Sequence, residues 1–181
     1  MYNLTSIKNI EEIIDIHIID SLTAIKSIEE KTANIADPNL VDVGSGNGIP
    51  GIVWAIFKNK ISITLIEKME KKTVFLRNVI GDLNLKNVRV KQANIYSNYE
   101  FPKFDIISSR AFTDPVSFLL STEKLAKKNS HWLLMTTSKK IKLLNNSFLK
   151  KNNFKIDNKI NYSEKKINNK LLLWISKNNG I

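Results

Sequence analysis

Three glycines at alternate positions constrain this chain more than any other feature of its sequence. They lie in the segment Asp42-Val-Gly-Ser-Gly-Asn-Gly-Ile-Pro-Gly51, which overlaps the short apolar run 39–43. Glycine has no Cβ atom, so such a loop can turn tightly and let a ligand approach the backbone. Pro50 suits the first turn of a helix, which the apolar residues 51–57 continue. The segment therefore predicts a buried strand, a glycine loop and a helix whose free N–H groups face a ligand.

An acidic residue follows the loop at a spacing typical of nucleoside-binding folds. Residues 62–66 form a second apolar run, and Glu67 ends it 19 residues after Gly48. A carboxylate at this place can accept hydrogen bonds from both hydroxyls of a ribose. The order of strand, loop, helix, strand and acid predicts that a cofactor containing a nucleoside binds here.

The loop spacing separates two cofactors that fit this order. Dinucleotide-binding folds use G-x-G-x-x-G and place an anionic pyrophosphate on the helix end. Here Gly44, Gly46 and Gly48 have the spacing G-x-G-x-G, and Asp42 comes just before them. An acid at that point repels a pyrophosphate and attracts a cation, which favours S-adenosylmethionine with its amino group and sulfonium. A nicotinamide-dependent oxidoreductase is the less favoured alternative.

Strand and helix patterns alternate over residues 39–136, which predicts an α/β fold with a mostly parallel sheet and helices on both faces. The expected strands are 39–43, 62–66, 88–92, 104–108 and 131–136, and residues 154–160 and 170–176 are expected to form a closing antiparallel hairpin. The expected helices are 11–28, 51–57, 71–83 and 115 to about 127, the last capped by Asp114.

We expect one domain over residues 1–181, divided into three parts. Residues 1–38 would form an N-terminal helical cap, residues 39–136 a cofactor-binding core, and residues 137–181 a basic C-terminal part. A chain of 181 residues with 43% hydrophobic side chains can bury one sizeable core. Ligands of open α/β sheets bind beyond the carboxyl ends of the strands, so the functional residues should lie at that edge.

Composition limits the possible partners and the compartment. No apolar run approaches the length of a membrane span, and the first residues lack the basic and apolar regions of a signal peptide. The chain has no cysteine and two histidines, His17 and His131, which argues against a metal site. We therefore expect a cytoplasmic protein that binds neither a membrane nor a metal.

The net charge of +11 is concentrated near the C-terminal end. Residues 1–123 contain 14 Lys and Arg and 15 Asp and Glu, whereas residues 124–181 contain 14 Lys and two acids. The chain is rich in Lys (25), Ile (26) and Asn (22), so AT-rich codons can account for many lysines. Codon bias acts along the whole chain, however, and does not explain the segregation. The basic region therefore favours a polyanionic partner such as nucleic acid.

At these residues the sequence resembles the ribosomal RNA small-subunit methyltransferase G family, also called glucose-inhibited division protein B. The glycine segment with its Pro-Gly ending carries the resemblance, together with Tyr2-Asn-Leu-Thr-Ser6, His17-Ile-Ile-Asp-Ser21, Phe75-Leu76 and Ser109-Arg-Ala-Phe112. The resemblance covers most of the chain and is thin after about residue 136. It implies a Rossmann-like class I methyltransferase fold. It also implies transfer of a methyl group from S-adenosylmethionine to N7 of one guanine in 16S rRNA.

The resemblance also implies roles for individual residues. By position, the cofactor site would include Gly44, Ile49, Ile95, Tyr96 and Arg110, with Glu67 as the ribose-binding acid. The rest of the loop, Gly46 and Gly48, belongs to the same expected site. Asp42 is expected either at the amino group of the methionine or on the loop amides, and both contacts can coexist. The implied partner is 16S rRNA or the small ribosomal subunit. Nothing in the sequence demands a dimer, so we expect a monomer.

The sequence departs from the family pattern in three places. The family usually has a helical segment before Asn-Leu-Thr-Ser, and this chain starts almost at that motif. Ile95-Tyr96 stands where Ala/Val-Glu is common, and Met135-Thr136-Thr137 stands where Leu-Lys-Gly is expected. Lys139 and Lys140 are close enough to replace the missing lysine. These departures keep open a second function, that of a degenerate relative that binds rRNA without turnover.

The implied chemistry needs no general base, because guanine N7 has a lone pair and no proton. Catalysis would then depend on alignment of the reacting atoms. Arg110 is the expected positioning residue, with a structural role for the same side chain as the alternative. His17 can contact RNA or brace the cofactor loop together with Asp20, one helical turn away. Phe112 and Tyr96 can stack on an extruded guanine, Phe112 alternatively packing in the core, while Lys139 and Lys140 are expected to contact phosphates.

Overall fold

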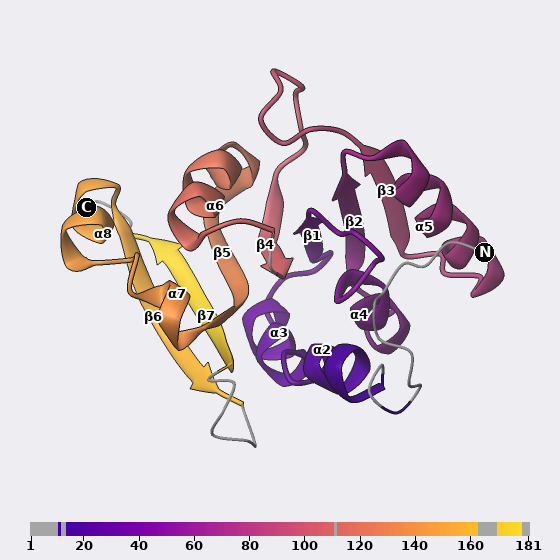
Figure 1. The fold of residues 1–181 in the computed structure, drawn as a ribbon, viewed down its shortest axis with the longest axis horizontal. Coiled ribbons are helices and arrows are strands. Elements are labelled where there is room, and N and C mark those ends of the chain that lie inside the picture. Colours follow the sequence, from indigo (N-terminus) through magenta and orange to yellow (C-terminus); the bar gives the residue numbers. More distant parts are fainter. Residues whose placement is uncertain (1–10, 12–13, 111, 163–169, 179–181) are drawn as a thin grey trace.

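One seven-stranded sheet organises the chain, and helices cover it on both sides (Figure 1). The computed structural model describes residues 11, 14–110, 112–162 and 170–178. The strand order is β3-β2-β1-β4-β5-β7-β6. Neighbours among β1 to β5 pair in parallel, whereas β7 is antiparallel to both β5 and β6. This confirms the predicted mostly parallel sheet with a closing antiparallel hairpin.

The strands are β1 (Asn39–Val43), β2 (Ser62–Glu67), β3 (Val88–Gln92), β4 (Phe104–Arg110), β5 (Ala126–Thr137), β6 (Phe154–Asn161) and β7 (Lys170–Lys177). The helices are the π-helix η1 (Ile14–Ile19), α2 (Asp20–Leu22), α3 (Ile25–Thr32), α4 (Gly51–Phe57), α5 (Glu70–Asp82), α6 (Pro115–Thr122), the 3₁₀-helix η2 (Glu123–Leu125), α7 (Ser138–Ile141) and α8 (Asn146–Lys151). The motif Tyr2–Ser6 lies outside the described residues.

The prediction of one helix over residues 11–28 is wrong, because the structure divides this stretch into η1, α2 and the start of α3. Two hydroxyl groups compete for backbone carbonyls at the junctions. Ser21 Oγ donates to His17 O at 2.5 Å, and Thr23 Oγ1 donates to Asp20 O at 2.6 Å. Such local side-chain bonds offer the backbone an alternative to a regular helical ladder.

The helix predicted from residue 115 to about 127 ends earlier, at Thr122, and β5 begins at Ala126 rather than at 131. Contacts with a distant segment explain both differences. Ser130 Oγ accepts the Lys127 N–H at 2.7 Å and donates to Phe104 O at 2.5 Å, while Lys127 Nζ pairs with Asp105 at 2.8 Å. These bonds hold residues 126–130 beside β4. Because they join segments far apart in the sequence, the local hydrophobic pattern does not predict them.

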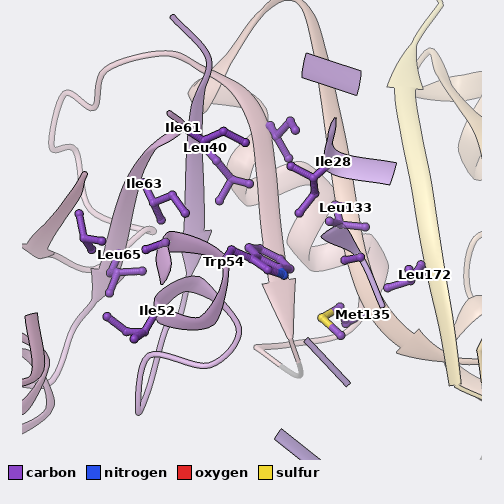
Figure 2. Packing of buried hydrophobic residues seen from close by; sticks show 14 of the residues in the cluster. Ile28, Leu40, Ile52, Trp54, Ile61, Ile63, Leu65, Leu133, Met135 and Leu172 are labelled. Atoms are coloured by element: carbon purple, nitrogen blue, oxygen red, sulfur yellow. The ribbon is translucent and has the colours of Figure 1, made fainter. Parts of the chain in front are cut away.

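Two apolar clusters lie on opposite faces of the sheet. Figure 2 shows one of them, in which Trp54 of α4 packs among side chains of the strands and of α3, including Ile28, Leu40 and Leu133. The other cluster packs α6 against β5 and β6 through Phe118, Trp132 and Phe154. Alternate residues of β5 therefore point to different clusters, as the pleat of a strand requires.

Strand order determines where a ligand can bind. β1 lies between β2 and β4 in the sheet. The chain therefore passes from β1 to β2 on one side, and from β4 to β5 on the other side. The carboxyl ends of β1 to β5 meet at one edge because these strands are parallel. In open α/β sheets the crevice at such a switch point is where ligands bind. Within the described ranges, no helix has both the length and the apolar character needed to cross a membrane.

Candidate functional site

The glycine loop follows β1 and is tied to the neighbouring strand. The N–H groups of Gly44 and Ser45 both donate to Ile66 O, at 2.9 and 3.1 Å. Gly44 has a φ of +72°, in the left-handed region that favours glycine. A Cβ atom added at Gly44 would overlap the ring of Phe112, so the absence of a side chain lets that ring approach the loop.

Glu67 lies at the end of β2 and holds this loop from below. Its carboxylate accepts the Gly46 N–H on Oε2 at 3.0 Å and the Met69 N–H on Oε1 at 2.9 Å. The side chain is 5% exposed. A carboxylate has about four lone-pair sites, so each oxygen can still accept from a ligand hydroxyl.

A cavity of about 310 Å³, which we call the glycine-loop cavity, opens beside Glu67. Five predicted site residues line it, namely Gly44, Glu67, Ile95, Tyr96 and Phe112. Ile95 is buried, whereas Tyr96 is 60% exposed and its ring stacks on that of Phe112 with centroids 6.3 Å apart. The cavity thus combines a buried acid with an apolar and aromatic wall, as an adenosine group requires.

Three other predicted loop residues do not line this cavity. Gly46 reaches it only through its bond to Glu67. Gly48 lies against α4 and α5, where a Cβ atom would meet Ile52 and Leu76. Ile49 is half-buried in the turn that enters α4. These three residues therefore determine the shape of the loop and do not contact a group in the cavity directly.

Asp42 lies under the glycine loop and is 1% exposed. Its Oδ2 has no hydrogen-bond partner and lies beside the Gly51 backbone. Burial raises the pKa of Asp42 to about 7, although the Gly51 backbone and the charge of Arg110 act in the opposite direction. A buried carboxylate with one unpartnered oxygen is costly, and its ionised form would be stabilised by a cationic group placed nearby.

Arg110 ends β4 and joins a polar cluster that we call the Asp20 cluster: His17, Asp20, Arg110, Tyr162 and Lys170. Arg110 Nη2 lies 2.7 Å from His17 Nδ1, and Nη1 lies 3.4 Å from Asp20 Oδ2. Lys170 Nζ donates to Asp20 Oδ1 at 2.7 Å. Asp20 is 8% exposed, so a nearly buried carboxylate joins the N-terminal segment to β4 and β7.

This cluster changes the proton affinities of its members. Burial and then the charge of Arg110 lower the pKa of His17 below its usual range. Burial and then Asp20 raise the pKa of the Tyr162 hydroxyl. Both groups are therefore neutral at neutral pH.

A second cavity of about 290 Å³, the β4–β5 cavity, opens beside Arg110. Ser109, Arg110 and Thr113 form one wall, the end of β5 from Leu134 to Thr137 forms another, and Asp20, Tyr162 and Lys170 lie at its polar end. Sequence reasoning missed Tyr162 and Lys170, which are far from Arg110 along the chain. The one sequence feature that pointed to this cavity was the unusual Met135-Thr136-Thr137 segment, which lines it.

The lysines at the two ends of β5 have different surroundings. Lys139 and Lys140 are exposed on α7, which follows the carboxyl end of β5, and Lys140 lines the β4–β5 cavity. Lys127 and Lys128 lie at the opposite end of β5, where Lys127 is paired with Asp105. Of these, only the lysines of α7 adjoin one of the two cavities, the β4–β5 cavity. No group of three or more His, Cys, Asp or Glu side chains that could hold a metal is found among the described residues.

Comparison with known sequences identifies related proteins. A family model described as rRNA small subunit methyltransferase G matches residues 1–171. The chain is 35% identical over 132 residues to the ribosomal RNA small subunit methyltransferase G of Laribacter hongkongensis, covering 73% of this chain and 60% of that protein. The protein of the same name from Neisseria gonorrhoeae is 37% identical over 134 residues, covering 74% and 61%. The chain thus spans about 60% of the length of the curated relatives it matches.

Comparison with solved structures supports the fold. A SAM dependent methyltransferase from Aquifex aeolicus has a TM-score of 0.68 at 15% identity, covering 91% of this chain and 92% of that chain. The ribosomal protein L11 methylase from Lactobacillus delbrueckii subsp. bulgaricus has a TM-score of 0.66 at 15% identity, covering 87% and 76%. These similarities show that the chain has the Rossmann-like fold of class I methyltransferases.

Proposed function

The chain belongs to the rRNA small subunit methyltransferase G family, and we propose that it transfers a methyl group from S-adenosylmethionine to N7 of a guanine in 16S rRNA. One observation carries the cofactor assignment. Glu67 holds the glycine loop by its carboxylate at the rim of a cavity of about 310 Å³. A buried acid in this place serves a nucleoside with free ribose hydroxyls.

Each part of the site fits a portion of S-adenosylmethionine. Glu67 would accept from the ribose hydroxyls, while Ile95 and Tyr96 would pack against the adenine. Asp42 is buried and lines neither cavity, so it would act on the cationic end of the methionine through its charge. When bound, the cofactor supplies an electrophilic methyl carbon on a sulfonium. In its ionised form, Asp42 would repel the pyrophosphate of a dinucleotide, which disfavours that class of cofactor.

The protein's own contribution to the reaction is alignment. N7 of guanine attacks with its lone pair and releases no proton, so no side chain has to act as a base. Arg110 is held by His17 and Asp20 beside the β4–β5 cavity, where it would position the target nucleotide. Holding two reactants in a productive geometry can lower a barrier by roughly 7–11 kcal/mol.

The basic residues support an rRNA partner. Lys139 and Lys140 lie next to the β4–β5 cavity and would bind backbone phosphates, which position RNA without reading its sequence. We further propose that residues 1–181 act as a single domain and a monomer. Since the substrate is 16S rRNA or the small ribosomal subunit, the activity would take place in the cytoplasm.

Two measurements test the function. Titration calorimetry with S-adenosylmethionine and separately with nicotinamide adenine dinucleotide should give binding of the first alone. Radiolabelled methyl transfer to small ribosomal subunits that lack the modification should then label 16S rRNA, and mass spectrometry of the digested RNA should locate 7-methylguanosine. Cofactor binding without methyl transfer would contradict the enzyme. Absence of cofactor binding by the folded protein would favour a degenerate relative that binds rRNA.

A further inference from the structure

One short segment separates the two cavities at the carboxyl edge of the sheet. Ser109, Arg110 and Thr113 line the β4–β5 cavity, whereas Phe112 lines the glycine-loop cavity. Ligands in the two cavities would therefore contact the same stretch of chain after β4. If the glycine-loop cavity holds the adenosine part of the cofactor, the β4–β5 cavity is the neighbouring space for a second reactant.

The walls of the β4–β5 cavity suit the face of a flat ring. Phe118, Leu134 and Met135 are buried side chains that line it, and Pro115 adds further apolar surface. Its volume of about 290 Å³ lies just below the range of typical ligand pockets, which starts at roughly 300 Å³. A single base is a better match for this volume than a dinucleotide. Extruded bases are bound by stacking on apolar and aromatic side chains.

The polar end of the same cavity is held in place by Asp20. This nearly buried carboxylate accepts from Lys170 at 2.7 Å and faces Arg110 at 3.4 Å, while His17 contacts Arg110 from another side at 2.7 Å. Lys140 adds a third cation at the rim. Because Asp20 engages both Arg110 and Lys170, these donors are positioned before any ligand arrives.

Cationic donors in this position discriminate between purines. Guanine presents the acceptor O6 next to N7, whereas adenine presents the donor N6 amino group there. We infer that the β4–β5 cavity receives the guanine base extruded from rRNA, with its O6 toward Arg110 and Lys170. N7, on the same edge of the base, then faces the segment shared with the glycine-loop cavity. This inference rests on the proposed function and assigns its substrate pocket.

The first test fills the cavity. Thr136 lines it, and Thr136→Phe would place a ring where the base is expected. Methyl transfer to unmodified small subunits is compared with cofactor affinity measured by calorimetry. We expect kcat/KM for the subunit to fall at least about 10-fold with unchanged affinity for S-adenosylmethionine. Ser62→Phe is the control, because it adds the same ring at an exposed position at the amino end of β2, outside both cavities.

A second test keeps the cavity open and removes one donor. Lys170→Met should raise the KM for the subunit without weakening cofactor binding. Lys159→Met, an exposed lysine of β6 outside the cavity, should leave both parameters unchanged. If Thr136→Phe prevents folding, the comparison of Lys170→Met with Lys159→Met still tests whether this cavity binds the base.

The possible outcomes are distinguishable. Full methyl transfer by cofactor-bound Thr136→Phe, or an unaltered KM in Lys170→Met, overturns the pocket assignment and leaves the proposed function standing. Loss of cofactor affinity in either variant also overturns it, because the two cavities would then not be separate sites. If the unaltered protein binds cofactor and methylates no rRNA, the proposed function fails and the inference fails with it.

Discussion

The Gly46 N–H donates to Glu67 Oε2 over 3.0 Å, which joins the glycine loop after β1 to the acid at the end of β2. The other oxygen of Glu67 accepts the Met69 N–H just before α5 at 2.9 Å. One buried carboxylate therefore fixes the loop and the start of the next helix together. A ligand that bonds to Glu67 meets an acceptor whose position is already determined.

Replacing Glu67 should weaken cofactor binding. Glu67→Ala removes the acceptor for the ribose and leaves two backbone N–H groups without their partner. We expect the binding free energy of S-adenosylmethionine to become less favourable by about 1–3 kcal/mol, measured by titration calorimetry. Glu100→Ala, at an exposed loop position, is the control and should bind as the unaltered protein does. An unchanged affinity of Glu67→Ala would refute its assignment to the ribose.

A side chain at Gly44 should disturb the site, whereas one at Gly81 should not. Gly44→Ala places a Cβ at φ +72° and against the Phe112 ring, so we expect a loss of stability of about 1–2 kcal/mol and weaker cofactor binding. Gly81 lies within α5 with open space around it, and Gly81→Ala should stabilise the protein by up to about 1 kcal/mol. Thermal unfolding and calorimetry measure both. Equal effects of the two substitutions would contradict the close approach of Phe112.

Asp42 should make the stability of the protein depend on pH. The pKa is about 7 in the folded chain and 3.8 for an ordinary aspartate, so between these values the folded state binds more protons than the unfolded state. Stability from this group therefore falls as the pH rises from about 4 to 7 and is constant above.

The variant Asp42→Asn removes this titration and isolates it from the histidines. Urea unfolding of both proteins at about pH 5 and pH 8 should show that the unaltered protein loses roughly 2–3 kcal/mol more than the variant over this interval. Parallel pH dependences would mean that Asp42 is already ionised at low pH and that the fold stabilises its charge.

Asp20 should support methyl transfer through Arg110 and Lys170. Asp20→Asn leaves both cations without their shared counter-charge, so we expect a loss of stability of about 1–3 kcal/mol and a fall in kcat for methyl transfer. Cofactor affinity should change less, since Asp20 does not line the glycine-loop cavity. The control Glu29→Gln breaks an ion pair between the partly exposed Lys58 and the exposed Glu29 and should cost under about 1 kcal/mol. A loss of cofactor affinity as large as the loss of turnover would contradict this role.

The lysines at the two ends of β5 should differ in their contribution to RNA binding. Replacing Lys139 and Lys140 by Ala should weaken rRNA binding and reduce the slope of log affinity against log salt by about 1 for each phosphate that the variant no longer binds. Lys128→Ala, at the far end of β5, is the control and should leave the slope unchanged. Fluorescence anisotropy over a range of salt concentrations gives both slopes. If the slope of log affinity against log salt were the same for all variants, the RNA would bind away from Lys139 and Lys140.

The order of strands and helices could be predicted because each element carries its own signal. The apolar runs at 39–43 and 62–66 and the glycines after the first of them are local, and they agree with β1, β2 and the loop between β1 and α4. The ends of the helix near residue 122 and of the N-terminal helix could not be predicted. There, Ser130 and Lys127 bond to β4, and Ser21 and Thr23 bond to nearby carbonyls.

The sequence alone determined the order of elements, the glycine loop and the acid that follows it, since these depend on backbone conformation and spacing within about 30 residues. Only the tertiary structure brought Asp20, Arg110 and Lys170 together, from positions up to 150 residues apart. It also placed Phe112 and Arg110 on different cavities, although only one residue lies between them in the sequence. The physical reason is that burial and charge pairing between distant segments are properties of the packed sheet, which a one-dimensional pattern does not record.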